Sequence, residues 1–262
     1  MLNNKMTLSN RLYALIENED HSSVNYIIAS YIMENFEKLK HCSSTELARQ
    51  CNVSKASISR FCRKIGLEDY FDLKLLINNY SNEDVLKEKY SFQNMDQDGV
   101  REFLEVLQVK LANLTNTLDR DVLKQLVQDI HQYEHVYLLG NQQSMSIASY
   151  LQTNLLSYNK LTNCLSNYED QKELLLRGKK DNLVIVFSAT GAFFDRVLRN
   201  IKLLERTDGP TIYLITNNQV DYPFLKQSIC LGEKYDFVSN DLLYVYASLI
   251  TIEYRNLWLE SK

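Results

Sequence analysis

Basic and hydroxyl side chains recur at helical spacing between residues 44 and 64, where they could bind DNA. The segment 38–64 carries seven Lys or Arg residues and one acidic residue, Glu46, although the whole chain has a formal net charge of −4. A local basic patch attracts a phosphate backbone. A solvated helix face has the same composition, so charge alone leaves both interpretations open.

The segment 54–65 has the pattern of an amphipathic helix. Ser54 is a predicted N-cap and Gly66 a predicted stop. Ile58, Phe61, Cys62 and Ile65 follow the spacing i, i+3, i+4, i+7, which predicts one buried face. The other face combines small residues, which allow close approach to a major groove, with arginines that reach guanine or phosphate. An ordinary helix in a bundle is the alternative. The candidate DNA-binding residues are Ser44, Thr45, Ser54, Lys55, Ala56, Ser57, Ser59, Arg60, Arg63 and Lys64.

Glycine and hydroxyl residues follow two apolar runs, 135–140 and 183–187. A phosphate dianion is bound well by hydroxyls and free amides where a strand leads into a helix, although such residues are also ordinary loop chemistry. The candidate ligand-binding residues are Gly140, Gln143, Ser144, Ser188, Thr190 and Gly191.

Short helices are predicted to position the basic set. Their ranges are 10–17, 23–36, 43–51, 54–65 and 70–80, with Ser43 capping a helix whose Glu46 can reach back to it. Residues 81–98 are polar and weakly periodic, so we interpret them as a linker. The predicted domains are therefore a helical DNA-binding domain over 1–80, the linker over 81–98 and a second domain over 99–262.

The second domain is predicted to be α/β. Two helices, 99–116 and 121–132, precede strands at 135–140, 161–166, 183–187, 211–216 and 228–232, which alternate with helices at 144–157, 169–176, 192–206 and 239–259. Near-continuous apolar strands in this order predict a parallel sheet covered on both faces. The fold class is thus multidomain: an all-α helix-turn-helix bundle followed by a three-layer α/β domain.

The segment VSKASISRFCRKIG, residues 53–66, resembles the recognition region of the RpiR (MurR/RpiR) family of bacterial regulators. The match includes Glu46-Leu47-Ala48 before it and LEDYFDLKLLI after it, so it covers about residues 10–80. The resemblance implies that the second half is a sugar isomerase (SIS) domain, a parallel sheet flanked by helices that binds phosphosugars.

The ligand motifs of this chain depart from the SIS pattern at two positions. Gln142 stands where the family has a second glycine, and Phe193 stands where it has a last hydroxyl. Phe193 cannot donate a hydrogen bond to phosphate; its bulk could occupy the phosphate position, or it could pack against the sheet. Both a working sugar-phosphate site and a site that is altered or lost, leaving a dimerisation scaffold, remain open.

No residue set predicts an enzyme. Isomerisation needs a positioned base, and the candidates Glu169, Asp170, Asp195, Glu233 and His135 fall in no motif that supports one. The five cysteines have no zinc spacing and are expected to be reduced and mostly buried. We expect no catalytic residue, metal or cofactor. The chain shows no signal-peptide core and no apolar run long enough to span a bilayer, which predicts a cytoplasmic location and no membrane partner.

The predicted function is a DNA-binding transcription regulator, with sugar metabolism genes as expected targets. The expected partners are double-stranded DNA with a palindromic operator, a small phosphosugar-like effector, and a second copy in a homodimer or dimer of dimers. The alternatives are a regulator with a degenerate, non-sensing SIS domain and a sugar-phosphate isomerase.

Overall fold

The structure is a computed structural model that describes residues 8–78, 98–141, 143–198 and 201–260. The chain divides into two compact units, residues 1–89 and 90–262, which are described separately below. The predicted linker, 81–98, lies outside the described residues except for Asp98, as do the last two residues of the predicted helix 70–80.

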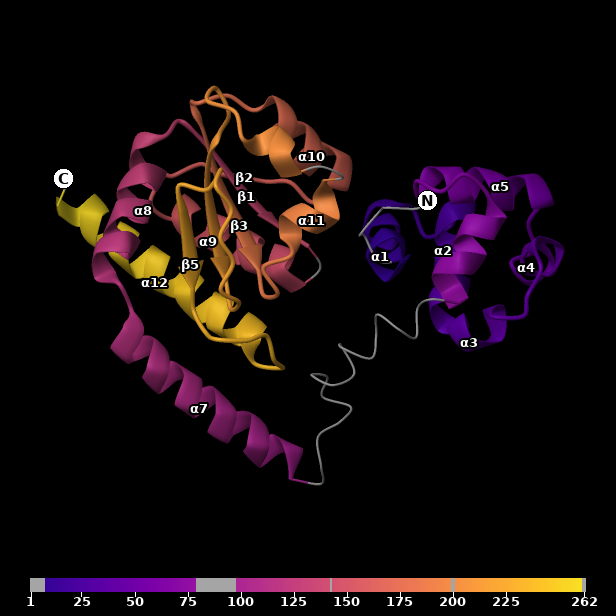
Figure 1. The fold of residues 1–262 in the computed structure, drawn as a ribbon, viewed down its shortest axis with the longest axis horizontal. Coiled ribbons are helices and arrows are strands. Elements are labelled where there is room, and N and C mark those ends of the chain that lie inside the picture. Colours follow the sequence, from indigo (N-terminus) through magenta and orange to yellow (C-terminus); the bar gives the residue numbers. More distant parts are fainter. Residues whose placement is uncertain (1–7, 79–97, 142, 199–200, 261–262) are drawn as a thin grey trace. The chain divides into compact units, whose positions relative to one another are not determined.

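The first unit is helical, as predicted (Figure 1). Its described elements are α1 (Leu8–Asn18), α2 (Val24–Glu34), α3 (Phe36–Leu39), α4 (Ser44–Gln50), α5 (Lys55–Lys64) and a helical stretch over residues 70–78. Their apolar faces meet in one core that contains Leu12, Ile28, Leu47 and Phe61.

The predicted helix 23–36 is interrupted. It ends at Glu34, and Asn35 leaves the helical conformation with φ −130° before α3 begins. The Asn35 side-chain amide donates to the Tyr31 carbonyl at 2.9 Å, a bond that the backbone amide of a continuing helix would make. Local competition from the asparagine side chain explains the break.

The second unit has a five-stranded parallel sheet in the order β2-β1-β3-β4-β5, which confirms the predicted fold class. Its elements are α7 (Gly99–Thr117), α8 (Arg120–Gln132), β1 (His135–Gly140), α9 (Gln143–Leu156), β2 (Asn163–Cys164), α10 (Tyr168–Arg177), β3 (Asn182–Ser188), α11 (Phe193–Val197), a 3-10 turn (Ile201–Leu204), β4 (Thr211–Thr216), β5 (Gln227–Cys230) and α12 (Ser239–Glu260). The strand predicted over 161–166 is only two residues long.

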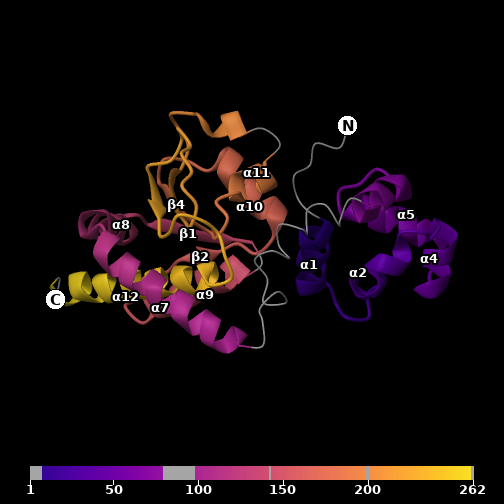
Figure 2. The ribbon, with the colours of Figure 1, turned by 60° about the horizontal axis from the view of Figure 1, so that its bottom comes forward.

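The strands of this sheet bury both faces, which is why they are almost continuously apolar. On one face Leu138, Ile185 and Tyr213 pack with α8, α9 and α12. On the other face Val184 and Leu214 pack with α10 and α11. Figure 2 shows these helices on opposite sides of the sheet, so the unit has three layers.

The helix predicted over 192–206 is not continuous. α11 ends at Val197, and Leu198 is extended with φ −119° and ψ 138°. The Tyr168 hydroxyl donates to the carbonyls of Arg196 (3.1 Å) and Val197 (2.6 Å), which a longer helix would use for its own hydrogen bonds. A side chain from α10 therefore terminates α11.

Candidate DNA-binding surface and ligand crevice

Helices α4 and α5 are joined by a four-residue turn. Asn52 adopts a left-handed conformation with φ 52°, which asparagine tolerates better than most residues, and the Val53 amide donates to the Ala48 carbonyl at 2.9 Å. The Ser54 hydroxyl accepts from the Ser57 amide, so the predicted N-cap of α5 is confirmed. These contacts fix the direction in which α5 leaves the turn.

Only half of the capping box predicted for α4 forms. The Ser43 hydroxyl accepts from the Glu46 amide at 3.1 Å, as predicted. The Glu46 carboxylate does not reach back to Ser43; it accepts from Arg49 Nη2 at 2.7 Å. That bond and the Arg49 charge lower the pKa of Glu46. The prediction of a reciprocal bond was wrong because a guanidinium one turn away is the stronger partner.

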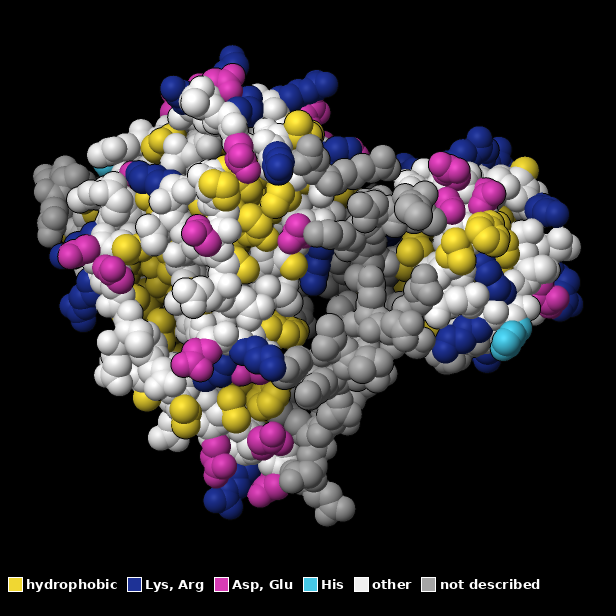
Figure 3. Space-filling view, viewed as in Figure 1, with side chains coloured by type: hydrophobic (Ala, Val, Ile, Leu, Met, Phe, Trp, Pro, Cys, Tyr) yellow, Lys and Arg dark blue, Asp and Glu magenta, His cyan; other side chains and the backbone are white. Residues whose placement is uncertain are grey.

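The two faces of α5 are those that the periodicity predicts. Ile58, Phe61 and Cys62 have no exposed surface and Ile65 is 7% exposed. The outward face carries Lys55, Ala56, Ser59, Arg60, Arg63 and Lys64, all of them exposed. Figure 3 shows Lys and Arg side chains over the part of the helical unit that α4 and α5 form.

Ser57 differs from the other candidates because it is buried, with 9% of its surface exposed. Its hydroxyl lies 2.9 Å from Ser54 Oγ and accepts from Arg60 Nη2 at 3.2 Å. Ser57 is therefore placed to orient Arg60 and not to face outward. Thr45 and Ser54 are exposed and Ser44 is half-buried.

The C-terminal end of α5 is held by a contact that the sequence did not indicate. Arg11 of α1 is 6% exposed, and its Nη1 donates to the carbonyls of Ile65 (2.7 Å) and Gly66 (3.2 Å). A cation at a helix C-terminus also favours the helix dipole. Gly66 has φ 77°, which confirms the predicted glycine stop. Arg11 thereby fixes the end of α5 from a position 54 residues earlier in the chain.

Burial keeps two thiols of this unit protonated. It raises the pKa of Cys51 to about 11 and that of Cys62 to about 12. Cys42 and Cys164 are half-buried and Cys230 is exposed, so only part of the cysteine set is buried, and all five are free thiols.

The strand order of the second unit indicates where a ligand crevice is expected. The chain passes from β1 to β2 on one side and then to β3 on the other, so the order reverses between β1 and β3. Open α/β sheets bind ligands outside the carboxyl ends of the strands at such a switch point. Gly140 ends β1 and Ser188 ends β3, and these strands are neighbours with Gly140 paired to Phe187. The two predicted loops therefore leave the same edge side by side.

Gly140 is required by the close approach of α9. A Cβ at this position would lie 2.6 Å from both the backbone carbon and the backbone oxygen of Ser144. The Gly140 carbonyl accepts from the Gln171 side-chain amide at 3.0 Å. The first turn of α9 is thus pressed against the end of β1, with Ser144 7% exposed and Gln143 exposed.

The loop after β3 forms a tight turn. Gly191 has φ 73°, and its amide donates to the Ser188 carbonyl at 3.0 Å. Ser188 is 7% exposed and Thr190 is half-buried. Phe193 packs in the core on the α10–α11 face, 1% exposed, with its ring perpendicular to that of Phe194. Of the two orientations considered for Phe193, the structure shows packing against the sheet. Gln142 lies outside the described residues.

Asparagines at this same edge were missed by the sequence reasoning. Asn217 follows β4, is fully buried, and donates from Nδ2 to the Ser239 carbonyl at 2.8 Å. Its Oδ1 has no hydrogen-bond partner among the described residues. Asn240, in the first turn of α12, donates to Gln143 Oε1 at 2.5 Å. The signal was available: TNN at 216–218 also follows an apolar strand of a parallel sheet.

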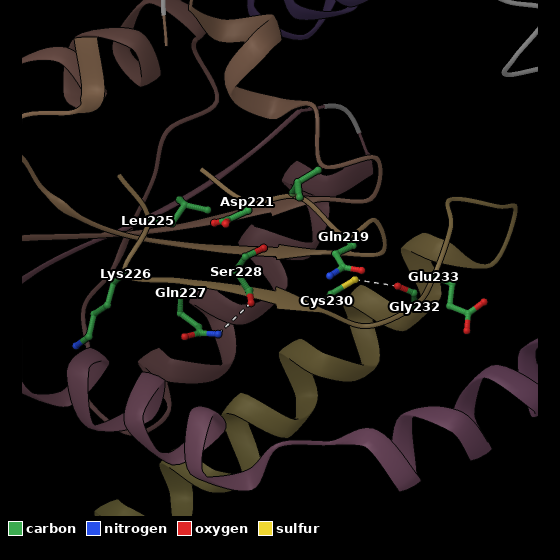
Figure 4. Close-up of a pocket in the computed structure, with 10 residues that line it drawn as sticks. Gln219, Asp221, Leu225, Lys226, Gln227, Ser228, Cys230, Gly232 and Glu233 are labelled. Carbon is green, nitrogen blue, oxygen red and sulfur yellow. Dashed lines mark hydrogen bonds between the residues drawn. The ribbon is translucent and has the colours of Figure 1, made fainter. Parts of the chain in front are cut away.

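A cavity of about 520 Å³ lies elsewhere, along the edge strand β5 (Figure 4). Its lining includes Gln219, Lys226, Ser228, Cys230 and Glu233. Lys226 donates to the buried Asp129 carboxylate at 2.5 Å. The cavity does not include the predicted ligand residues.

Two of the acidic residues considered as bases, Glu169 and Asp195, have partners close to them in the fold. Glu169 pairs with Lys172 at 3.1 Å, and Asp195 accepts from the Tyr222 hydroxyl at 3.2 Å. Within the described residues, no group of His, Cys, Asp or Glu side chains could hold a metal ion. No helix in the described part of the chain is long and apolar enough to cross a membrane.

Comparison with known proteins gives a family for the helical unit. The helix-turn-helix domain of the rpiR family matches residues 4–83. An uncharacterised HTH-type transcriptional regulator of Caldanaerobacter subterraneus is 50% identical over 50 residues, which are 19% of this chain and 18% of that protein. The HTH-type transcriptional regulator HexR of Pseudomonas aeruginosa is 22% identical over 191 residues, 72% of this chain and 66% of HexR. The chain thus spans less than two thirds of the length of these curated relatives.

Among solved structures, the NanR protein of Vibrio vulnificus, complexed with ManNAc-6P, matches 97% of this chain and 93% of its own with a TM-score of 0.53. Its sequence identity is 17%, so the likeness shows a shared fold. The helical unit therefore belongs to the rpiR family of helix-turn-helix domains, and an α/β unit with a five-stranded parallel sheet follows it in the chain.

Proposed function

We propose that this protein is a transcription regulator that binds double-stranded operator DNA through the exposed face of α5. The observation that carries the proposal is the composition of that face. It combines the small side chains of Ala56 and Ser59 with the guanidinium groups of Arg60 and Arg63 on a helix fixed at both ends. The naming of the relatives as HTH-type transcriptional regulators supports it.

The test is selection of an operator from random duplex DNA, followed by affinity measurements on variants. If Arg60 or Arg63 contacts a base, its replacement by Ala weakens specific binding by about 1–3 kcal/mol. Lys64→Ala, as a phosphate contact, weakens specific and non-specific binding alike. Unchanged operator affinity in both arginine variants would refute α5 as the recognition helix.

We propose that the protein assembles as a homodimer or dimer of dimers on a palindromic operator, with half-sites about one helical turn apart.

We infer further that the crevice between β1 and β3 binds a phosphorylated sugar as effector. Ser144, Ser188 and Thr190 supply hydroxyls there, and α9 directs its first-turn amides to the same edge. The packing of Phe193 in the core supports a crevice that its ring does not fill. NanR, which shares the fold, was solved with ManNAc-6P.

A panel of hexose 6-phosphates in a thermal-shift assay tests this second part, because a ligand stabilises only the state that it binds. Stabilisation that disappears in Ser188→Ala supports the crevice. No stabilisation by any member would favour a regulator with a non-sensing α/β unit. Isomerase turnover by the pure protein without DNA retention would overturn the regulator proposal.

A further inference from the structure

The loop between β5 and α12, residues 231–238, is attached to the candidate ligand crevice through Asn218. The Asn218 side-chain amide donates from Nδ2 to the Thr190 carbonyl at 2.8 Å. Its Oδ1 accepts from the Tyr235 amide at 2.8 Å. Asn218 is the second residue after β4, and its one side chain joins the turn after β3 to the loop before α12.

The same loop is attached to α7 on its other side. Lys110 of α7 donates from Nζ to Asp236 Oδ2 at 2.5 Å, with the two side chains 20% and 19% exposed. Water screens such a pair less than a fully exposed one. The other oxygen of Asp236 accepts from Ser239 Oγ and the Val238 amide. The Phe237 ring adds a contact to Phe103 of α7, with centroids 6.2 Å apart.

Apart from these contacts, a second bond from Lys110 Nζ to the Lys234 carbonyl (3.4 Å) and the packing of Leu111 against the core, α7 buries little of its surface. Leu114 is the one buried residue of Gly99–Thr117, a helix that is described throughout. Val100 and Leu104, in the first two turns, are 79% and 58% exposed, and Figure 1 shows that end of α7 reaching past the body of the α/β unit. An element with few buried contacts moves at low energetic cost. Chain order also makes α7 the first element after the segment that connects it to the DNA-binding unit.

We propose that Asn218, Asp236 and Lys110 form a relay that couples the turn at Thr190 to the position of α7. A ligand that moves the Thr190 carbonyl shifts the loop 231–238 through Asn218, and the Lys110–Asp236 pair passes this shift to α7. The relay rests on the proposed effector site for its biological role. Asn218 and Lys110 are positioning residues in it, because they hold other groups in place.

Amide hydrogen exchange on the full-length protein tests the relay without any effector. Asn218→Asp keeps the acceptor for Tyr235 and removes the donor to Thr190; Lys110→Met keeps the alkyl stem and removes the charge. The controls are Asn154→Asp, which removes a similar amide-to-carbonyl bond inside α9, and Arg101→Met, which removes an ion pair inside α7.

Coupling predicts effects at the far end of the relay. Asn218→Asp should speed exchange in α7 roughly two- to tenfold, the range expected for loss of one hydrogen bond. Lys110→Met should speed exchange over residues 188–192 to a similar extent. The control variants should leave the far segment unchanged. If each variant alters only its own neighbours, the contacts are local and the relay is refuted.

Operator binding with and without the hexose 6-phosphate panel separates the relay from the proposed function. If a panel member changes the operator Kd of the wild type, by a factor of about 5–150 for typical coupling, Lys110→Met should bring that factor close to 1. The variant's affinity for operator alone should stay close to that of the wild type. An unchanged factor overturns the relay. If no member affects the wild type while exchange still shows coupling, the sugar-phosphate proposal fails and the relay stands.

Discussion

Replacing Gly140 by Ala tests the geometry on which the proposed ligand crevice depends. The new Cβ would lie 2.6 Å from two backbone atoms of Ser144 and 2.8 Å from the Met145 amide nitrogen. Ordinary contact begins at 3.4 Å, so the start of α9 or the end of β1 must move by about 0.8 Å. The obstacle is backbone on both sides, so no side-chain rotation relieves it.

The sign of the stability change discriminates between tight and open packing. Gly140 does not have a positive φ, so in open space alanine would stabilise the fold by about 0.4–1 kcal/mol through the unfolded state. Overpacking in a close-packed region costs about 1–3 kcal/mol. We therefore expect net destabilisation, with a Tm lower by roughly 2–4 °C per kcal/mol. Gly232→Ala is the matched control, because its nearest neighbour is at 3.6 Å.

Fluorescence of the single tryptophan provides the assay. Trp258 lies in α12, and the centroid of its ring is 5.6 Å from that of the Tyr158 ring. Its fluorescence therefore reports unfolding of the α/β unit. Gly140→Ala should unfold at lower temperature than the wild type and lose any stabilisation by sugar phosphates, while operator binding through α5 persists. A Gly140→Ala protein as stable as Gly232→Ala would refute the close approach of α9 to β1.

Two further predictions concern the helical unit. Iodoacetamide at pH 8 should modify the exposed Cys230 in the native protein and leave Cys62 intact, since burial raises the pKa of that thiol to about 12; equal labelling of both in a mass spectrum would contradict the packing of α5. Ser54→Ala should destabilise this unit by about 1 kcal/mol through loss of the N-cap, measured by urea titration of the far-UV circular dichroism. The control Ser59→Ala, on the exposed face of the same helix, should have no such effect, and equal midpoints for the two variants would exclude the capping role.

Periodicity predicted the elements well because the spacing of apolar residues within a short segment shows which face of a helix or strand is buried. The apolar residues spaced from Ile58 to Ile65 are buried on one face of α5, as their spacing predicts. Gly66, the predicted stop, has a positive φ, as expected for a glycine after a helix. The parallel sheet follows in the same way from apolar strands separated by helices.

Contacts between distant segments account for what the sequence did not predict. Arg11 holds the end of α5 from 54 positions away, and Tyr168 ends α11 from 28 positions away. In each case a distant side chain donates a hydrogen bond to a carbonyl at the end of a helix. A local pattern of hydrophobic residues does not predict such a bond. The helix predicted over 192–206 was wrong for this reason.

The position of the candidate ligand crevice could be predicted only in part from the sequence. In a parallel sheet every strand-to-helix loop leaves the same edge, so the ends of β1 and β3 could be placed together from the sequence. The same rule applies to the end of β4, yet Asn217 and Asn218 resemble ordinary loop residues until their partners are known. Asn217 holds the start of α12, and Asn218 holds the turn at Thr190. Asn218 thus joins the turn at Thr190 to the loop before α12. For this reason we propose that a ligand which moves this turn also acts on the Lys110–Asp236 contact with α7.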